Sequence, residues 1–469
     1  MATNAAKKQK EKELKKAPVK QKQEKLPTRE EMASALLEFV NAKMKGKAEL
    51  VRSSELSLTY INKRIPTGLL SLDLALMGGF PCAGVSQIIG RKNAGKSYLY
   101  WRMIRQLQML LGQKLHVLLA MTELRADRTQ ARLCGVQIAL SNEDIEEQQK
   151  AREKNGWPPL TTEEIASLKT EVGHIHELHG LDAVHLYDAI VRAVDMNVYH
   201  LIIIDSIGNM MSDQERENES VGDKTYSGVA GINTTMLHKI TSMLMMKDEN
   251  GRERETCMIV VNQVRDNIKD PNKDYKASGG NALEHAKFVD LFLYPGSAIG
   301  EEIAVPNLAK GGSKQQFTMY GKEINWRIEK GKAGIHEGGR GSYVYDFRIN
   351  GADDYLDTIV AGTKPEIGVI AQAGAWLTLV DPETGAPLMQ PDTIMVPDKE
   401  NPKKMVEVNN PKRGQELFKF QGREKFKQAL IEDAQAHAAN GTYEDSIMNL
   451  IRALCFKKAG INITYEWSY

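Results

Sequence analysis

Eight consecutive residues fit the phosphate-binding pattern G-x-x-x-x-G-K-[ST] completely. They are Gly90, Arg91, Lys92, Asn93, Ala94, Gly95, Lys96 and Ser97. The glycines allow backbone N–H groups to surround an anion, and the start of a following helix adds partial positive charge. Lys96 would reach the β- and γ-phosphates of a nucleoside triphosphate, and the Ser97 hydroxyl would bind Mg²⁺. The pattern therefore predicts a nucleoside triphosphate and Mg²⁺ as ligands.

Two carboxylates that follow apolar runs extend this prediction. Asp205 ends the run Leu201–Asp205, and P-loop enzymes hold Mg²⁺ with an aspartate at such a strand end. Glu123 follows a second apolar run and could act as the general base on an attacking water. A helix cap for Asp205 and an ordinary surface position for Glu123 are the alternative interpretations.

Amides and loop-like segments follow further strand ends. Asn262 and Gln263 end another apolar run, where an amide can bond a γ-phosphate and lose that bond after hydrolysis. A purely structural amide explains these two residues equally well. Two polar segments, 213–227 and 264–280, have the character of mobile loops. The second carries Arg265, Lys269, Lys273 and Lys276. Aspartates are mixed with these cations, so the charge alone is a weak indication of nucleic-acid binding.

The elements that must position these residues alternate between strand and helix from about residue 60 to 350. A helix is expected over Tyr98–Leu111. Strands are expected at Val85–Ile89, Leu115–Ala120, Leu201–Asp205, Met258–Asn262 and Val289–Tyr294. This alternation predicts an α/β fold with a mostly parallel sheet that is covered on both faces. The later segments Ile324–Ile328 and Tyr343–Ile349 are expected to be antiparallel.

Composition narrows the class of protein. The net charge is +1, so any contact with nucleic acid must come from local charge. No run approaches the roughly 18 apolar residues of a membrane span, and the N-terminus is charged rather than apolar. The four cysteines are isolated, which predicts neither a metal knuckle nor a disulfide framework. We therefore expect a cytoplasmic protein without a membrane partner.

The N-terminal region divides into two predicted parts. Residues 1–26 hold nine lysines against three glutamates and are expected to form a disordered basic tail. Residues 27–59 are expected to form an arm with a helix over 28–45. Thr28 and Glu31 have the capping-box spacing, and an extended piece is expected at Ala48–Arg52.

The rest of the chain is expected to form a core at 60–350 and a C-terminal α+β domain at 351–469. The core is interrupted at about 141–172 by a charged segment that predicts an inserted helical hairpin. Thr161 and Glu164 provide a second capping-box pattern there. Residues 381–415 are rich in Pro, Asn and Lys and are expected to form a long loop.

Several motifs occur in an order and at a spacing that resemble the RecA family of homologous-recombination ATPases, in style most closely the recombinases carried by phages. The resemblance covers about residues 48–378, apart from 141–172. The N-Q-x-R run at Asn262–Arg265 and the G-G-N-A-L run at Gly279–Leu283 are the most diagnostic motifs. The others are Arg64–Leu76, Thr122–Val136, Leu201–Ser206 and Ala373–Trp376.

The resemblance implies a P-loop RecA-like core, an N-terminal helix–strand docking arm and a small α+β C-terminal domain. It implies a single-stranded-DNA-dependent ATP hydrolase that uses ATP and Mg²⁺. Such a protein forms helical homo-oligomeric filaments on single-stranded DNA and exchanges strands with homologous double-stranded DNA in recombination and repair. Loader or single-strand-binding proteins would be further partners.

The resemblance also implies roles for individual residues. Glu123 would activate water, and Gln263 would couple the γ-phosphate to the segment 264–280. Lys330 and Lys332 resemble the family's lysine pair that is offered to the γ-phosphate of the neighbouring subunit. Tyr98 would follow the phosphate loop, and Asp127 and Gln130 would lie near the adenine. The implied DNA contacts are Ser227, Arg265, Lys269, Lys273, Lys276, Gly279, Gly280 and Asn281.

The chain departs from the family pattern at three points. Gly231 and His238 stand where bacterial members have arginines, and Gln130 replaces a stacking tyrosine. The insertion at 141–172 has no counterpart. Two alternative functions follow. One is a RecA-like paralogue that binds ATP and regulates a recombinase, and the other is a ring-forming DNA motor with the same core.

Overall fold

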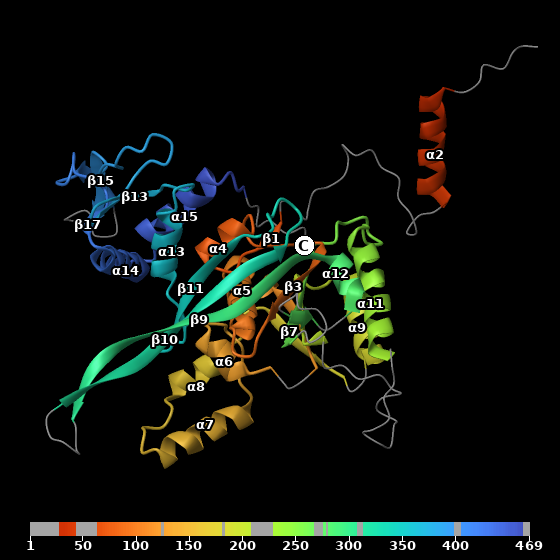
Figure 1. Ribbon diagram of the computed structural model, residues 1–469, viewed down its shortest axis with the longest axis horizontal. Coiled ribbons are helices and arrows are strands. Elements are labelled where there is room, and N and C mark those ends of the chain that lie inside the picture. Colours follow the sequence, from red (N-terminus) through yellow and green to blue (C-terminus); the bar gives the residue numbers. More distant parts are fainter. Residues whose placement is uncertain are drawn as a thin grey trace, which may run out of the picture. The chain divides into compact units, whose positions relative to one another are not determined.

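The computed structural model divides the chain into two units, Met1–Leu56 and Ser57–Tyr469. It describes residues 28–43, 63–122, 126–180, 183–207, 228–266, 275–277, 280–306, 313–397 and 405–462 (Figure 1). The basic tail 1–26 and the extended piece Ala48–Arg52 therefore lie outside the described residues. No helix in the described ranges is long and apolar enough to cross a membrane.

The described part of the first unit is one helix, α2 (Arg29–Lys43). The expected capping box is present at its start. The Thr28 amide donates to the Glu31 carboxylate over 2.7 Å, and the Glu31 amide donates to the Thr28 hydroxyl oxygen over 3.2 Å. Three large apolar side chains of α2 are exposed, namely Met32, Leu36 and Phe39. A helix of this length gains little stability by itself in water.

The second unit is built around a ten-stranded sheet (Figure 1). In spatial order its strands are β12 (Gly351–Ala352), β11 (Arg340–Asp346), β10 (Ser313–Lys330), β9 (Lys287–Pro306), β3 (Gly84–Gly90), β7 (Cys257–Asp266), β6 (Leu201–Asp205), β4 (His116–Met121) and β5 (His174–His179), and β8 (Tyr275–Ala277) pairs with β7. The six strands from β9 to β5 are parallel. The antiparallel strands β10, β11 and β12 extend one side. This confirms the expected α/β fold and the antiparallel order of the later strands.

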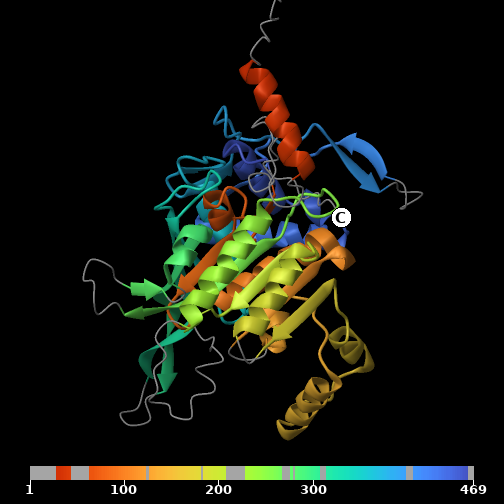
Figure 2. The ribbon, with the colours of Figure 1, turned by 90° about the vertical axis from the view of Figure 1, so that its right-hand side faces the viewer.

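Helices cover both faces of this sheet. The helices described between β1 and β9 are α4 (Leu70–Ala75), α5 (Lys96–Leu111), α6 (Arg128–Leu133), α7 (Asn142–Lys154), α8 (Thr162–Leu168), α9 (Ala183–Asp195), α11 (Gly228–Leu244) and α12 (Gly280–Ala286), with a 3₁₀ turn at Gly112–Lys114. Of these, α7 and α8 belong to the insertion. Alternate residues of a strand point to opposite faces. Accordingly, Leu201 and Ile203 join the core on the α5 side, whereas Ile202 and Ile204 join the core under α9 and α11. These two helices lie side by side in front of the sheet in Figure 2.

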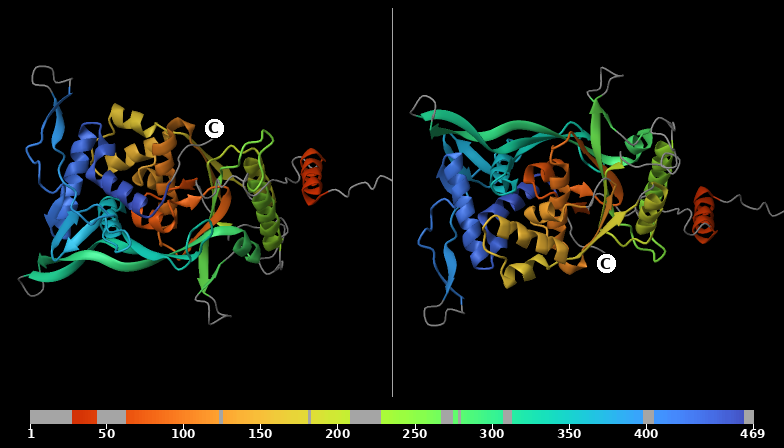
Figure 3. Two further views of the ribbon diagram at one scale, coloured as in Figure 1. Left: turned by 90° about the horizontal axis from the view of Figure 1, so that it is seen from above. Right: turned by 90° about the horizontal axis from the view of Figure 1, so that it is seen from below.

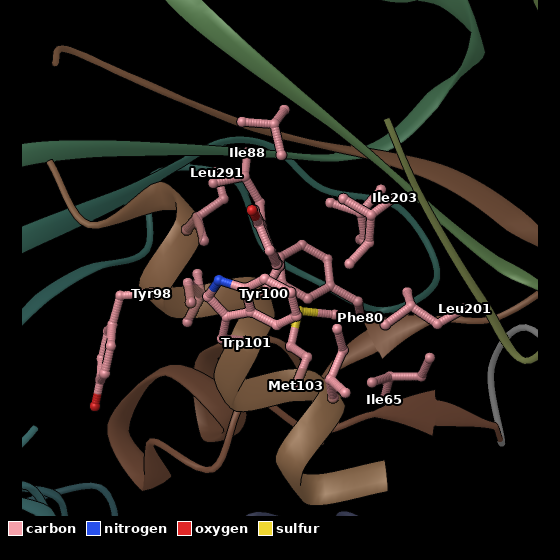
Figure 4. Packing of buried hydrophobic residues seen from close by; sticks show 14 of the residues in the cluster. Ile65, Phe80, Ile88, Tyr98, Tyr100, Trp101, Met103, Leu201, Ile203 and Leu291 are labelled. Atoms are coloured by element: carbon pink, nitrogen blue, oxygen red, sulfur yellow. The ribbon is translucent and has the colours of Figure 1, made fainter. Parts of the chain in front are cut away.

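The core on the α5 side is centred on large buried side chains. Figure 4 shows Trp101 and Met103 of α5 packed near Phe80 of β2 (Phe80–Pro81), with Leu201 and Ile203 reaching in from the sheet. Trp101 is fully buried. Strand β2 pairs with β1 (Arg64–Ile65) ahead of β3. This packing fixes the direction in which α5 leaves the phosphate loop.

Strands β9 and β10 form a long antiparallel ribbon that runs out beyond the rest of the sheet (Figures 1 and 3). They contain 20 and 18 residues, far more than the expected segments Val289–Tyr294 and Ile324–Ile328. The outer part of the ribbon exposes its large apolar side chains, such as Ile303, Phe317 and Met319, by 40, 53 and 44%. The strand structure of this part comes from the pairing of β9 with β10 rather than from burial.

The insertion forms the expected charged helical hairpin, α7 and α8. Thr161 and Glu164 make the expected capping box at α8. A further capping box joins Ser141 and Asp144 at α7. Trp157 lies in the connection from α7 to α8, and 61% of it is exposed.

The C-terminal region has its own apolar core, which includes Ile359, Phe426 and Ile451. Its elements are α13 (Asp354–Gly362), β13 (Ile370–Ala373), β14 (Trp376–Leu379), β15 (Thr393–Pro397), β16 (Met405–Asn409), β17 (Lys419–Gln421), α14 (Arg423–Ala439), a 3₁₀ turn at Tyr443–Asp445 and α15 (Ile447–Lys458). The expectation of a structureless loop at 381–415 was wrong, because β15 and β16 pair there as a hairpin. Each of these strands has only five residues, and the Pro, Asn and Lys residues around them dominate the composition of the segment.

Strand β5 was not expected, because its sequence His174–His179 has no apolar run. It places histidines beside others from neighbouring strands. The ring centroids of His116 and His174 are 4.6 Å apart, and those of His116 and His200 are 6.2 Å apart. The His116 amide donates to Nδ1 of His200 over 3.0 Å. Burial, followed by the charge of His116, lowers the pKa of His200 to about 4. Burial, His174 and His176 also lower the pKa of His116.

These histidines predict a loss of stability in mild acid. Because their folded-state pKa values lie below the unfolded value of about 6.5, the unfolded chain takes up protons first as the pH falls. The stability contributed by the neutral histidines should therefore be complete above pH 6.5. It should fall towards pH 4, by up to about 1.4 kcal/mol per pH unit for the buried His200 and by less for the more exposed His116. Glu255 opposes this shift at His200 and Lys63 adds to it.

Urea unfolding between pH 7.5 and 5 measures this effect. His200→Asn retains an acceptor for the His116 amide but cannot take up a proton, so its midpoint should depend less on pH. Equal slopes for the variant and the wild type would show that His200 does not contribute.

Candidate functional site

The phosphate loop connects β3 to α5 as a compact turn. Asn93 and Gly95 have φ angles of 62° and 83°, and Gly95 is the residue that precedes α5. A Cβ atom on Gly95 would lie 3.0 Å from the Tyr343 hydroxyl, and one on Gly90 would lie 2.3 Å from the Leu293 carbonyl oxygen. Only glycine fits both the left-handed conformation at Gly95 and the close approach at Gly90. The two glycines of the motif are therefore required by the packing beneath the loop.

Lys96 points back into this loop. Its Nζ donates to the carbonyl oxygens of Gly90 and Arg91 over 3.0 and 2.9 Å. Among the described side chains, none caps the start of α5. The first amides of the helix therefore point into the loop together with the lysine ammonium. Both features favour an anion at this place.

A cavity of about 340 Å³ opens beside the loop. Its lining is Asn93, Ala94, Gly95, Lys96, Ser97, Tyr98, Gln130, Lys322, Ile324, Tyr345 and Phe347. Lys322 donates to the Asn93 carbonyl oxygen over 2.7 Å, and burial lowers the pKa of Lys322. The sequence prediction missed Lys322 and Tyr345, because no local motif surrounds them. They border the loop only because β10 and β11 belong to the same sheet as β3 and pass near the loop.

Ser97 and Asp205, the expected Mg²⁺ residues, are linked through Tyr100. The buried Tyr100 side chain hydrogen-bonds to both of them. Burial and the Asp205 carboxylate raise the pKa of Tyr100, and the bond to Ser97 opposes that shift. A hydroxyl and a carboxylate oxygen are suitable Mg²⁺ ligands, and Mg²⁺ usually completes its shell with water and substrate phosphate. The two residues therefore fit the ion expected of them.

The carboxyl ends of the parallel strands bring further predicted residues to this edge. Gly90 pairs with Gln263 in register, and Asp205 pairs with Met121 and Val261. The side-chain oxygen of the buried Asn262 accepts from the backbone N–H of Gln263 over 2.9 Å. Gln263 itself is exposed. Glu123 lies outside the described residues. The described chain approaches it through Thr122, whose amide donates to the Asp205 carbonyl oxygen over 2.9 Å.

Of the residues expected near the adenine, Gln130 lines the cavity. Asp127 caps the start of α6. The Asp127 carboxylate accepts from the Gln130 amide over 2.8 Å and caps α6. The Tyr98 ring lines the cavity, while its hydroxyl accepts from the Arg102 guanidinium over 3.1 Å and from the Ala352 amide over 2.5 Å. In Figure 4 Tyr98 points away from the Trp101 cluster.

Lys330 and Lys332 lie away from the loop of their own chain. Lys332 lines a cavity of about 260 Å³ together with Gly84 and His238. Gly84 begins β3 and Gly90 ends it. At 3.3 Å per residue these ends are about 20 Å apart. Lys332 therefore does not reach a phosphate bound in the loop of the same chain.

The expected DNA residues fall into two groups. Arg265 and Lys276 are direct partners in the antiparallel pairing of β7 with β8, and Gly280 and Asn281 begin α12. The expected mobile loop 264–280 thus contains the end of β7 and the whole of β8, and its last residue begins α12. Ser227, Lys269, Lys273 and Gly279 lie outside the described residues, as do most of the segments 213–227 and 264–280.

The α/β fold and the turn between β3 and α5 define the architecture of P-loop nucleotide-binding proteins. No protein-family model matches the chain. The chain is similar to curated proteins named Protein RecA. The one from Bordetella petrii is 24% identical over 390 residues, which covers 81% of this chain and 88% of that protein. The one from Thermus aquaticus is 26% identical over 335 residues, or 71% and 80% of the two chains. The one from Heliobacterium modesticaldum is 23% identical over 337 residues, or 71% and 78%. These similarities support a RecA-like family.

Proposed function

We propose that this protein is a phage-type RecA-like recombinase. It would hydrolyse ATP with Mg²⁺, form helical filaments on single-stranded DNA, and exchange strands with homologous double-stranded DNA in the cytoplasm during recombination and repair. The observation that carries this proposal is the register at the carboxyl edge of the sheet. It aligns the phosphate loop, Gln263 and Asp205 on neighbouring strands, at the edge where open α/β sheets bind their ligands.

In this proposal each residue at the edge has one task. Lys96 and the amides at the start of α5 bind the β- and γ-phosphates, and Ser97 and Asp205 hold Mg²⁺. The Mg²⁺ ion neutralises charge that develops on the phosphates. Glu123 takes the proton from the attacking water. Gln263 bonds the γ-phosphate and releases the segment 264–280 after hydrolysis. Tyr98, Asp127 and Gln130 border the base.

Lys330 and Lys332 support the proposal that the site is completed by a second subunit. Lys332 lies about 20 Å from its own loop along β3, and Lys330 pairs with Asp290, which is level with Gln87 of β3. A neighbour arranged head to tail would bring both lysines to the γ-phosphate. There they would offset charge in the transition state as an arginine finger does. The exposed apolar residues of α2 fit the proposed docking arm at 27–59. The other proposed parts of the chain are a tail at 1–26, a core at 60–350 and a C-terminal domain at 351–469.

The cross-strand pair Arg265 and Lys276 supports DNA binding. The backbone register places two cationic residue types at opposite positions of β7 and β8, and in this proposal they contribute to the binding of DNA phosphates. The other proposed contacts, Ser227, Lys269, Lys273, Gly279, Gly280 and Asn281, flank this pair along the chain. Binding through phosphates predicts an affinity that falls steeply with salt.

The test is ATP hydrolysis with and without single-stranded DNA over a range of salt concentrations. We expect strong stimulation by DNA that weakens as salt rises. Arg265→Ala with Lys276→Ala should reduce the stimulation about tenfold at moderate salt and leave hydrolysis without DNA unchanged. Lys412→Ala with Arg413→Ala, in the C-terminal region, is the matched control and should behave as the wild type.

The opposite outcome favours the second candidate function. Hydrolysis that is indifferent to DNA would indicate a RecA-like paralogue that regulates a recombinase. The exposed Gly231 and His238 on α11, which carry no permanent positive charge, favour this candidate. Closed rings in electron micrographs would instead indicate a ring-forming DNA motor. Strand exchange by the purified protein, with or without loader proteins, would exclude both.

A further inference from the structure

A buried lysine lies next to the proposed intersubunit lysine pair. Lys287 begins β9 directly after α12, and its side chain is only 1% exposed. Its Nζ donates to Gln87 Oε1 over 3.2 Å and to Glu284 Oε1 over 2.8 Å, and it forms an ion pair with the Asp290 carboxylate. A buried cation is costly unless it is paired. Lys287 is therefore satisfied by two carboxylates and one amide.

The same two acidic residues border Lys330. Asp290 is the direct partner of Lys330 in the pairing of β9 with β10. The Lys330 Nζ donates to the backbone carbonyl oxygen of Glu284, and the Lys332 Nζ lies 5.7 Å from the centroid of the Phe288 ring, next to Lys287 in sequence. A third carboxylate, Glu329, forms an ion pair with Arg327. Lys330 thus has a backbone partner while Lys287 engages the nearby carboxylates.

Electrostatics indicates what would change without Lys287. Burial raises the pKa of Asp290, and the positive charge of Lys287 lowers it. The effect of burial is the larger of the two. If Lys287 were neutral, Lys330 would be the cationic residue directly opposite Asp290 in the pairing of β9 with β10. An ion pair in a partly buried place is stronger than one in water. Lys330 would then be held within its own subunit, away from the γ-phosphate of the neighbour.

We propose that Lys287 is a positioning residue that keeps Lys330 available to the neighbouring subunit by neutralising Asp290 and Glu284. This inference rests on the proposed function of Lys330 and Lys332. It adds the prediction that a residue without any contact to ATP controls turnover. Its effect should appear in kcat rather than in the KM for ATP, because the lysine pair acts on charge that develops in the transition state.

The experiment compares DNA-stimulated ATP hydrolysis by Lys287→Met and by Lys287→Met combined with Asp290→Asn. We expect the single variant to lose about tenfold in kcat, since a small displacement of a catalytic group has effects of this size or larger. Its KM should stay within about twofold of the wild type. The double variant removes the carboxylate that captures Lys330 and should recover most of the lost kcat. Lys287→Arg should retain activity.

Two further variants separate positioning from folding. Arg254→Met removes another buried cation, which pairs with Asp195 over 3.4 Å, and should keep kcat per folded molecule. Asp290→Asn alone leaves Lys287 its bonds to Glu284 and Gln87, and should keep or raise kcat even if Lys287→Met does not fold. Folded fractions are measured by circular dichroism.

Three results would overturn the inference. They are a Lys287→Met protein that folds and keeps its kcat, a double variant that recovers nothing, and an Asp290→Asn protein that loses activity tenfold. Failure of the proposed function is a different result. In that case Lys330→Ala with Lys332→Ala would hydrolyse ATP at the wild-type rate while Lys287 remained intact.

Discussion

Replacement of Lys96 by alanine is expected to abolish ATP hydrolysis, with a loss of about a thousandfold or more. The Lys96 ammonium group donates to the carbonyl oxygens of Gly90 and Arg91 in the phosphate loop. It therefore places a positive charge inside the loop. The γ-phosphate gains negative charge as the bond to it breaks, and a fixed cation beside it lowers the barrier. Steady-state phosphate release in the presence of single-stranded DNA measures the effect.

Lys114→Ala is the matched control for this experiment. Lys114 lies in the 3₁₀ turn at the far end of α5 and is exposed, so its removal changes the net charge equally and should leave hydrolysis intact. Thermal unfolding should show that both variants fold. A Lys96→Ala protein that still turned over ATP would show that the nucleotide is bound elsewhere.

Replacement of both Lys330 and Lys332 by alanine is expected to remove nearly all turnover, by about a hundredfold or more, while ATP binding is retained. The physical reason is that these ammonium groups would act on the nucleotide of another subunit. The loss should therefore appear in kcat and leave binding of a fluorescent ATP analogue unchanged.

Mixing two inactive proteins tests the intersubunit part of this prediction. The Lys96→Ala protein lacks a working phosphate loop but offers intact lysines, and the Lys330→Ala/Lys332→Ala protein has the opposite defect. In a random one-to-one mixture about a quarter of head-to-tail interfaces would combine both intact halves. Hydrolysis should recover to a similar fraction of the wild-type rate.

Two controls accompany the mixture. Each inactive protein alone, at the total concentration of the mixture, should remain inactive. A mixture that recovered nothing, from proteins that both bind DNA, would show that the lysines act within one chain or not at all.

The parts of the fold that local sequence predicted are those in which pattern and chemistry coincide. The run Leu201–Asp205 forms a strand with the same limits as expected, because four buried aliphatic residues leave little alternative. The capping boxes at Thr28 and Thr161 mark helix starts, since a side chain that satisfies the first amides acts within one turn. Strand β5 was missed because it has no apolar run of its own. Its stability comes from its pairing with β4.

For this protein, the sequence alone determined the chemistry of the phosphate loop, the class of fold and the strands that carry Asp205 and Gln263. Each of these depends on residues close together in the chain. Only the tertiary structure decided that Lys322 and Tyr345 border the same cavity, that Lys332 lies far from its own loop, and that Lys287 pairs with both acidic neighbours of Lys330. Register between strands and the burial of charges are properties of contacts between distant segments, and no local pattern in the sequence records them.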